Sequence, residues 1–90
     1  MRSRALPGAD LIEAGLTDLA AGVESLPALV VSIGAPRLRA LGLDVPSTIP
    51  APEHRLYERL RADDPDAAHS RYNALIRRLV SYERAAECAS

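Results

Sequence analysis

The sequence contains no Trp, no Phe and no Lys, and it has only three Tyr. A hydrophobic core must therefore be built from Leu, Val, Ile and Ala, which supply most of the 48% of residues that are hydrophobic. Ala and Leu favour helices, whereas the β-branched residues that favour strands are few and scattered. Because Ala buries little area, and burial stabilises by about 25 cal/mol per Å², we expect a small core that gains stability from self-association.

The sequence also has only one Cys and almost no net charge. The single Cys88 cannot form an intramolecular disulfide, and a lone thiol fits a reducing compartment. No apolar run approaches the length of a membrane span, so we expect a soluble cytoplasmic protein without a membrane partner. All eleven basic residues are Arg, a bias typical of a GC-rich, bacterial-like coding sequence. The net charge of -1 gives no electrostatic reason to expect nucleic acid as a partner.

The first part of the chain predicts a lead-in followed by a helix. Residues 1–9 contain two Arg, one Pro and one Gly, and we expect them to form a flexible lead-in to a single helical domain over residues 10–88. Asp10 stands where its carboxylate can cap a helix over about residues 11–21. Gly15 lies inside this helix, where it either weakens the helix or admits a close neighbour.

A second helix is expected after Ser25, because the serine hydroxyl can cap its first turn. Pro36 should interrupt this helix, since proline cannot donate a hydrogen bond to the carbonyl four residues earlier and its ring clashes with that carbonyl. We therefore predict either a kink or a break that leaves a separate short helix over residues 36–41. Three Pro within residues 43–52 then predict a loop.

Two further helices complete the predicted fold. The third covers about residues 52–62, and the last and longest covers residues 64–88, with Asp64 as its N-cap. The predicted fold class is therefore all-α, a small bundle of four to five helices with a Pro-broken second helix and a long C-terminal helix. We expect the C-terminal helix to be the central or dimerising element.

Apolar and aromatic residues of the C-terminal helix recur at steps of three and four, which places them on one stripe of the helix surface. A stripe of this kind packs against other helices, either of the same chain or of another molecule. We therefore interpret the chain as a protein-interaction or homo-oligomeric assembly module, such as a homodimer, that binds itself or another protein. The residues of this interaction seam are Ala68, Tyr72, Leu75, Ile76, Leu79, Val80 and Tyr82.

A His/Tyr cluster is an alternative basis for function. His54 precedes Tyr57 by the same spacing as His69 precedes Tyr72, each pair near a helix start. If both pairs faced one cleft, they would form a small-ligand-binding or catalytic site, since imidazole titrates near neutral pH. No nucleophile or metal-ligand spacing accompanies them, so we assign no catalytic residue, no metal and no cofactor. The same polar residues are equally well explained as the solvent-exposed flank of two helices. The candidate polar cluster consists of His54, Tyr57, His69, Arg71, Tyr72 and Asn73.

Nucleic-acid binding through Arg is a second alternative. Arg77 and Arg84 lie two helical turns apart, on the face of the C-terminal helix opposite the seam. Glu83 and Glu87 lie nearby, and no aromatic residues interleave with these Arg as they do in many nucleic-acid surfaces. The sequence therefore favours a solvated face at this position.

Overall fold

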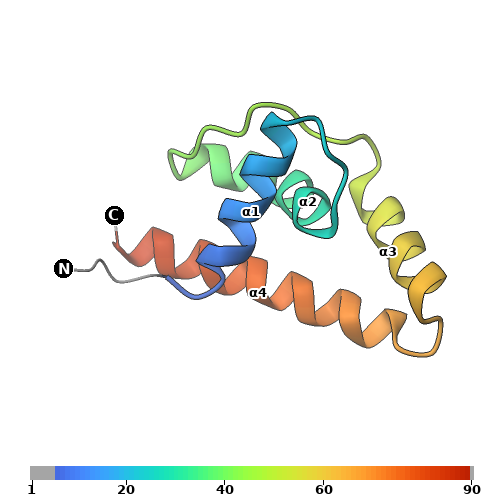
Figure 1. Ribbon diagram of the computed structural model, residues 1–90. Coiled ribbons are helices and arrows are strands. Elements are labelled where there is room, and N and C mark those ends of the chain that lie inside the picture. The colour runs from blue at the N-terminus through green and yellow to red at the C-terminus, as the bar shows by residue number, and fades with distance from the viewer. Residues whose placement is uncertain (1–5, 90) are drawn as a thin grey trace.

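The computed structural model describes residues 6–89 and is all-helical over that part of the chain (Figure 1). Its four helices are α1 (Ala9–Ala20), α2 (Leu26–Ala40), α3 (Pro52–Asp63) and α4 (Ala68–Ala89). The all-α class and the number of helices are as predicted. Of the lead-in predicted over residues 1–9, residues 1–5 lie outside the described part.

Helix α2 is the central element of the fold. It packs against α1, α3 and α4, while α4 runs along one side of the molecule, beneath the other helices in Figure 1. Four of the seven largest fully buried side chains belong to α2, and none belongs to α4. The C-terminal helix was predicted to be the central or dimerising element. The central place belongs to α2, while α4 touches all three other helices from one side, and its role as a dimerising element stays a prediction. The four α2 residues are Leu29, Val30, Val31 and Leu38.

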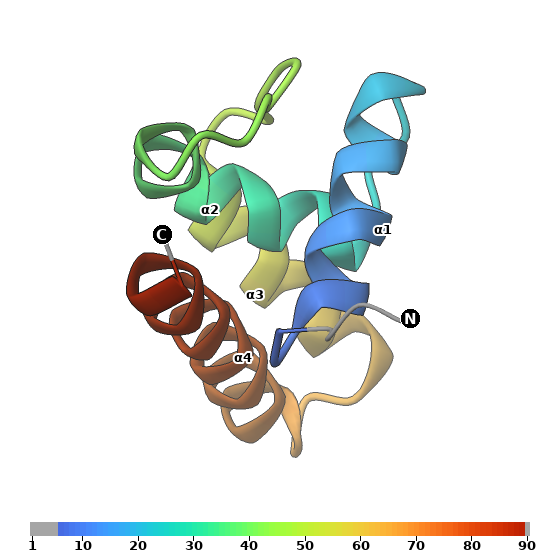
Figure 2. The same ribbon diagram turned by 90° about the vertical axis from the view of Figure 1, so that its left-hand side faces the viewer.

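Pro36 does not break the second helix. Helix α2 continues through it to Ala40, so the predicted separate helix over residues 36–41 is wrong. Pro36 is exposed, and its missing N–H removes one hydrogen bond, to the carbonyl of Ser32, out of a long ladder. The first turns of α2 are seen end-on in Figure 1 and side-on in Figure 2, whereas its last turns are side-on in Figure 1 and end-on in Figure 2. The helix thus accommodates Pro36 with a change in axis direction rather than a break.

The predicted N-cap of α2 is confirmed, whereas the N-cap of α1 differs from the prediction. Ser25 caps α2 as predicted, because its hydroxyl accepts a hydrogen bond from the backbone N–H of Ala28 at 3.1 Å. At α1 the N-cap is Gly8, with φ 79°, and Asp10 lies inside the first turn and pairs with Arg78 instead. The predicted cap at Asp10 is therefore wrong.

The last helix begins later than predicted. Asp64 accepts hydrogen bonds from the N–H groups of Asp66 and Ala67, which form a turn, and regular helix starts only at Ala68. An Asp side chain that bonds its own backbone two residues on stabilises a turn in competition with helix. No helix within residues 6–89 is long and apolar enough to cross a membrane.

Candidate functional site

The predicted polar cluster is only partly assembled. Tyr57 of α3 and Tyr72 of α4 meet edge to face, with ring centroids 5.9 Å apart and an interplanar angle of 69°. Burial, together with the charge of Glu53, raises the pKa of the Tyr72 hydroxyl, so it stays protonated near neutral pH. This pair joins α3 to α4 by aromatic packing.

The other members of that cluster make different contacts. Asn73 and His69 hydrogen-bond each other at 3.2 Å on the exposed side of α4, and His54 is exposed on α3. Arg71 forms an ion pair with Asp63 at 2.6 Å, which closes the turn between the two helices. These side chains therefore either join α3 to α4 or lie on the solvent-exposed side of the two helices. Their contacts do not support a catalytic role.

Most of the interaction seam is used inside the chain. Ala68 and Leu79 are buried, and the three larger residues Tyr72, Leu75 and Tyr82 pack against the core. The remaining two seam residues lie at its edge. Ile76 is half-buried, and Val80 keeps 37% of its surface exposed.

A groove that the sequence did not reveal lies between three distant segments. Its volume is about 280 Å³, and it is enclosed by the turn after α1, the loop before α3 and the first turn of α3. Val23, at its rim, is 48% exposed and is one of only two large hydrophobic residues that are exposed within the described part of the chain, the other being Val80. The groove is lined by Leu19, Gly22, Val23, Glu24, Ser47, Thr48, Ile49, Pro50 and Arg55.

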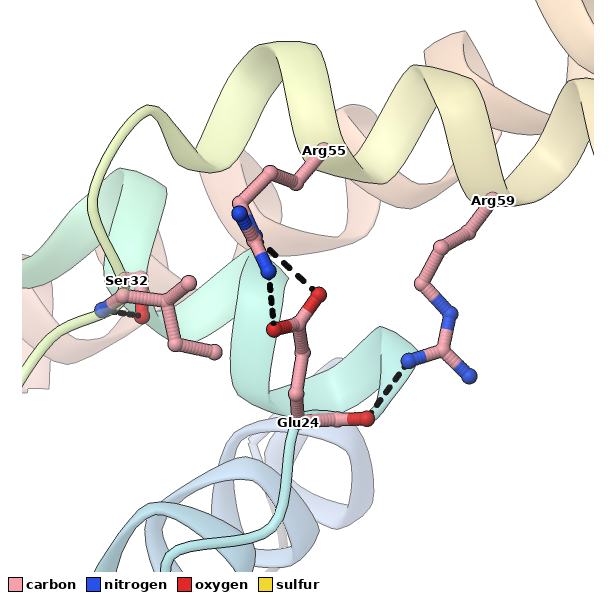
Figure 3. A network of polar contacts seen from close by, with 5 residues as sticks. Glu24, Ser32, Arg55 and Arg59 are labelled. Atoms are coloured by element: carbon pink, nitrogen blue, oxygen red, sulfur yellow. Dashed lines mark hydrogen bonds and ion pairs between the residues drawn. The ribbon is translucent and has the colours of Figure 1, made fainter.

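An ion pair closes one side of this groove (Figure 3). The guanidinium of Arg55 donates two hydrogen bonds to the Glu24 carboxylate, from Nε at 3.2 Å and from Nη2 at 2.7 Å. Arg59, one turn further along α3, donates to the backbone carbonyl of Glu24 at 2.5 Å. The hydrogen bonds from Arg55 hold the pKa of Glu24 below its ordinary value, and those same bonds raise the pKa of Arg55.

A buried serine holds the other side of the groove in place. Ser32 of α2 donates its hydroxyl hydrogen to the carbonyl of Ala28 at 2.9 Å. The same hydroxyl accepts from the backbone N–H of Ile49 at 3.1 Å (Figure 3). Arg39 of the same helix donates to the carbonyl of Val45 at 3.1 Å. Two side chains of α2 therefore fix the course of the loop that lines the groove.

The sequence pattern does not indicate these groove residues, and the reason is physical. Val23 and Ile49 follow no common helical period, and more than twenty residues separate them in the chain. The only local signal is an apolar residue between Gly22 and Glu24, in a turn where polar residues are usual.

A second, more open cavity lies beside α4. Its volume is about 520 Å³, and its walls come from the chain before α1 and from the outer side of α4. Arg78, in its lining, donates to both carboxylate oxygens of Asp10, at 3.0 and 3.1 Å, and these bonds lower the pKa of Asp10. Its lining residues are Pro7, Gly8, Ala74, Arg77, Arg78 and Ser81.

One acidic side chain is buried away from both cavities. Glu83 of α4 is 8% exposed, and a Cβ built on Gly34 of α2 would lie 3.0 Å from its carboxylate. Burial raises the pKa of Glu83, and the positive charge of Arg37 opposes that shift. No group of three or more His, Cys, Asp or Glu within residues 6–89 is placed to hold a metal ion.

No family model, no curated protein and no solved structure matches this chain.

Proposed function

We propose that this chain is a protein-interaction module that self-associates through the exposed edge of the seam on α4. The observation that supports the proposal is the pair of seam residues left at the edge of the core. Ile76 and Val80 lie one helical turn apart, so their side chains are neighbours on one flank of α4. Exposed apolar groups rimmed by polar ones are typical of protein contact surfaces.

The residue order on this flank suits two antiparallel copies of α4. With a two-fold axis near the middle of the helix, Ile76 of one copy lies opposite Val80 of the other, and the reverse contact is identical. In the same register, Arg84 of one copy is level with residue 72 of the other, so it lies one residue, ~1.5 Å along the helix axis, from Asn73. The side-chain carbonyl of Asn73 can then accept from that guanidinium, since its amide nitrogen already bonds His69. An apolar centre with a polar rim is the usual composition of an interface.

The complex is expected to be weak and reversible. The accessible surface of the chain is 5336 Å², close to the ~5,100 Å² expected for a folded monomer of this mass. The single chain therefore buries its core without a second copy. A patch centred on two aliphatic residues is also smaller than the ~1,000 Å² that stable interfaces exceed.

Sedimentation velocity from micromolar to millimolar concentration tests this proposal. We expect the wild-type chain to shift from monomer towards dimer over that range, and Val80→Arg to stay monomeric because an arginine at the centre repels its own copy. Val23→Arg is the matched control, since it places the same charge at the other exposed valine, away from α4. A wild-type chain that is monomeric at millimolar concentration, or a Val80→Arg chain that dimerises like the wild type, would contradict the proposal.

The two alternative hypotheses receive less support from the contacts. The His/Tyr cluster is divided between a packed tyrosine pair and exposed side chains. For nucleic acid, the chain would need free cations, yet Arg37, Arg55, Arg71 and Arg78 are each paired with an acidic side chain. Arg77 and Arg84 are exposed on α4, and two charges give only a small electrostatic attraction to phosphate.

A further inference from the structure

We infer that the groove between the α1–α2 turn and the loop before α3 binds a small apolar carboxylic acid. Its carboxylate would lie against Arg55, and its hydrocarbon part against Leu19, Val23 and Ile49. This site is separate from the α4 surface proposed above, so the two proposals stand or fall independently.

The size of the groove sets the size of the ligand. Its volume of about 280 Å³ lies just below the ~300–1,000 Å³ typical of small-molecule sites. A short branched acid fits such a space. The apolar walls formed by Leu19, Val23, Ile49 and Pro50 favour a hydrocarbon group over a polar one.

The polar side of the groove keeps hydrogen-bond donors that the fold does not use. A guanidinium carries five N–H donors, and Arg55 uses two of them on Glu24. Three donors remain, and the hydroxyls of Ser47 and Thr48 also line the groove. Carboxylates are the acceptors that a fixed guanidinium binds best.

The charges near the groove also favour an anion. Glu24 neutralises Arg55, and Arg59 adds a further positive charge at the backbone of Glu24, as Figure 3 shows. These three side chains together carry one net positive charge. Glu24 moreover holds the Arg55 guanidinium in one position, so little conformational entropy is lost when a ligand binds.

The loop side of the site is equally well positioned. The bond from the Ile49 N–H to the Ser32 hydroxyl anchors that wall to the buried helix α2. The groove is therefore preformed, as small-molecule sites usually are. For a ligand of so few atoms we expect binding in the millimolar range.

An NMR titration of the full chain with isocaproate tests the inference, with backbone amide shifts as the readout. We expect shifts concentrated at residues 19–24, 47–49 and 55. Binding should be about tenfold or more weaker for the neutral isocaproamide, because the charge-assisted hydrogen bonds are lost. N-acetyl-leucine is a third probe, which resembles the carboxyl end of a peptide. If it binds while isocaproate does not, the site takes a chain end and the inference is wrong.

Two substitutions on α3 separate specific from general effects. Arg55→Gln should weaken isocaproate binding about tenfold or more, while Arg61→Gln, an equal charge loss at an exposed position on the same helix, should leave it unchanged. Thr48→Val keeps the side-chain shape and removes one hydroxyl, and it should weaken binding less than Arg55→Gln does. Equal binding of acid and amide, equal binding by the Arg55 and Arg61 variants, or shifts outside the groove would each overturn the inference.

Discussion

Gly15 of α1 lies directly against the backbone of Pro27 at the start of α2. A Cβ built on Gly15 would stand 2.4 Å from the carbonyl oxygen of Pro27 and 2.4 Å from Cγ2 of Val31. Both distances are far below van der Waals contact, so the two helices can approach this closely only where α1 has a glycine. The sequence left two explanations for Gly15 open, and this contact shows that it admits a close neighbour.

Gly15→Ala is therefore expected to destabilise the protein. The substitution improves helix propensity by about 1 kcal/mol, but the added methyl group must push α1 away from a buried helix, which costs typically ~1–3 kcal/mol and more where backbone is hit. We expect a net loss of about 1–2 kcal/mol in the free energy of unfolding, measured by urea denaturation. Thr17→Ala, at an exposed position of the same helix, should change it by no more than about 0.5 kcal/mol. A Gly15→Ala chain as stable as the wild type would contradict the close contact.

Ser32→Ala should loosen the loop that forms the groove. The substitution removes the acceptor for the Ile49 N–H and leaves that group without its partner, at an expected cost of about 1–3 kcal/mol. Urea denaturation measures the cost, and hydrogen exchange at the Ile49 amide reports the local effect. Ser70→Ala, at an exposed position of α4, is the control and should be nearly neutral. Unchanged exchange at Ile49 in the Ser32 variant would show that the loop is held by other contacts.

The buried Glu83 should give the protein a stability component that falls as pH rises. Because burial raises its pKa above the ordinary value of 4.5, the folded chain binds more protons here than the unfolded chain between the two pKa values. This component is present below the ordinary pKa and is lost as pH rises through the folded pKa. Asp10 and Glu24 act in the opposite sense, since their lowered pKa values mean that their contributions are lost as pH falls.

Glu83→Gln separates these effects, because it keeps the shape of the side chain and removes its charge. We expect the variant to be more stable than the wild type near neutral pH, with the difference shrinking in acid, as measured by denaturation at several values between about pH 4 and 8. Glu13→Gln, at an exposed position of α1, should leave the pH profile unchanged. If the Glu83 variant is less stable than the wild type at neutral pH, the carboxylate has a stabilising partner and the reasoning fails.

The contact between two members of the predicted polar cluster joins helices that follow each other directly in the chain. Tyr57 and Tyr72 meet because a short turn joins α3 to α4, so residues near that turn are brought together whatever the rest of the fold does. The groove combines the end of α1 with the loop near Ile49, and no sequence spacing connects these segments.

The local elements follow from the sequence alone: the all-α class, the Ser25 cap, the proline-rich loop and the apolar stripe of α4. Each depends on signals that act within one or two helical turns. The tertiary contacts make α2 central and carry it through Pro36. They also pack most of the α4 stripe against the core of the same chain and form a groove beside Val23. These features depend on which helix faces meet, and a pattern that marks a face as apolar does not specify the surface that covers it.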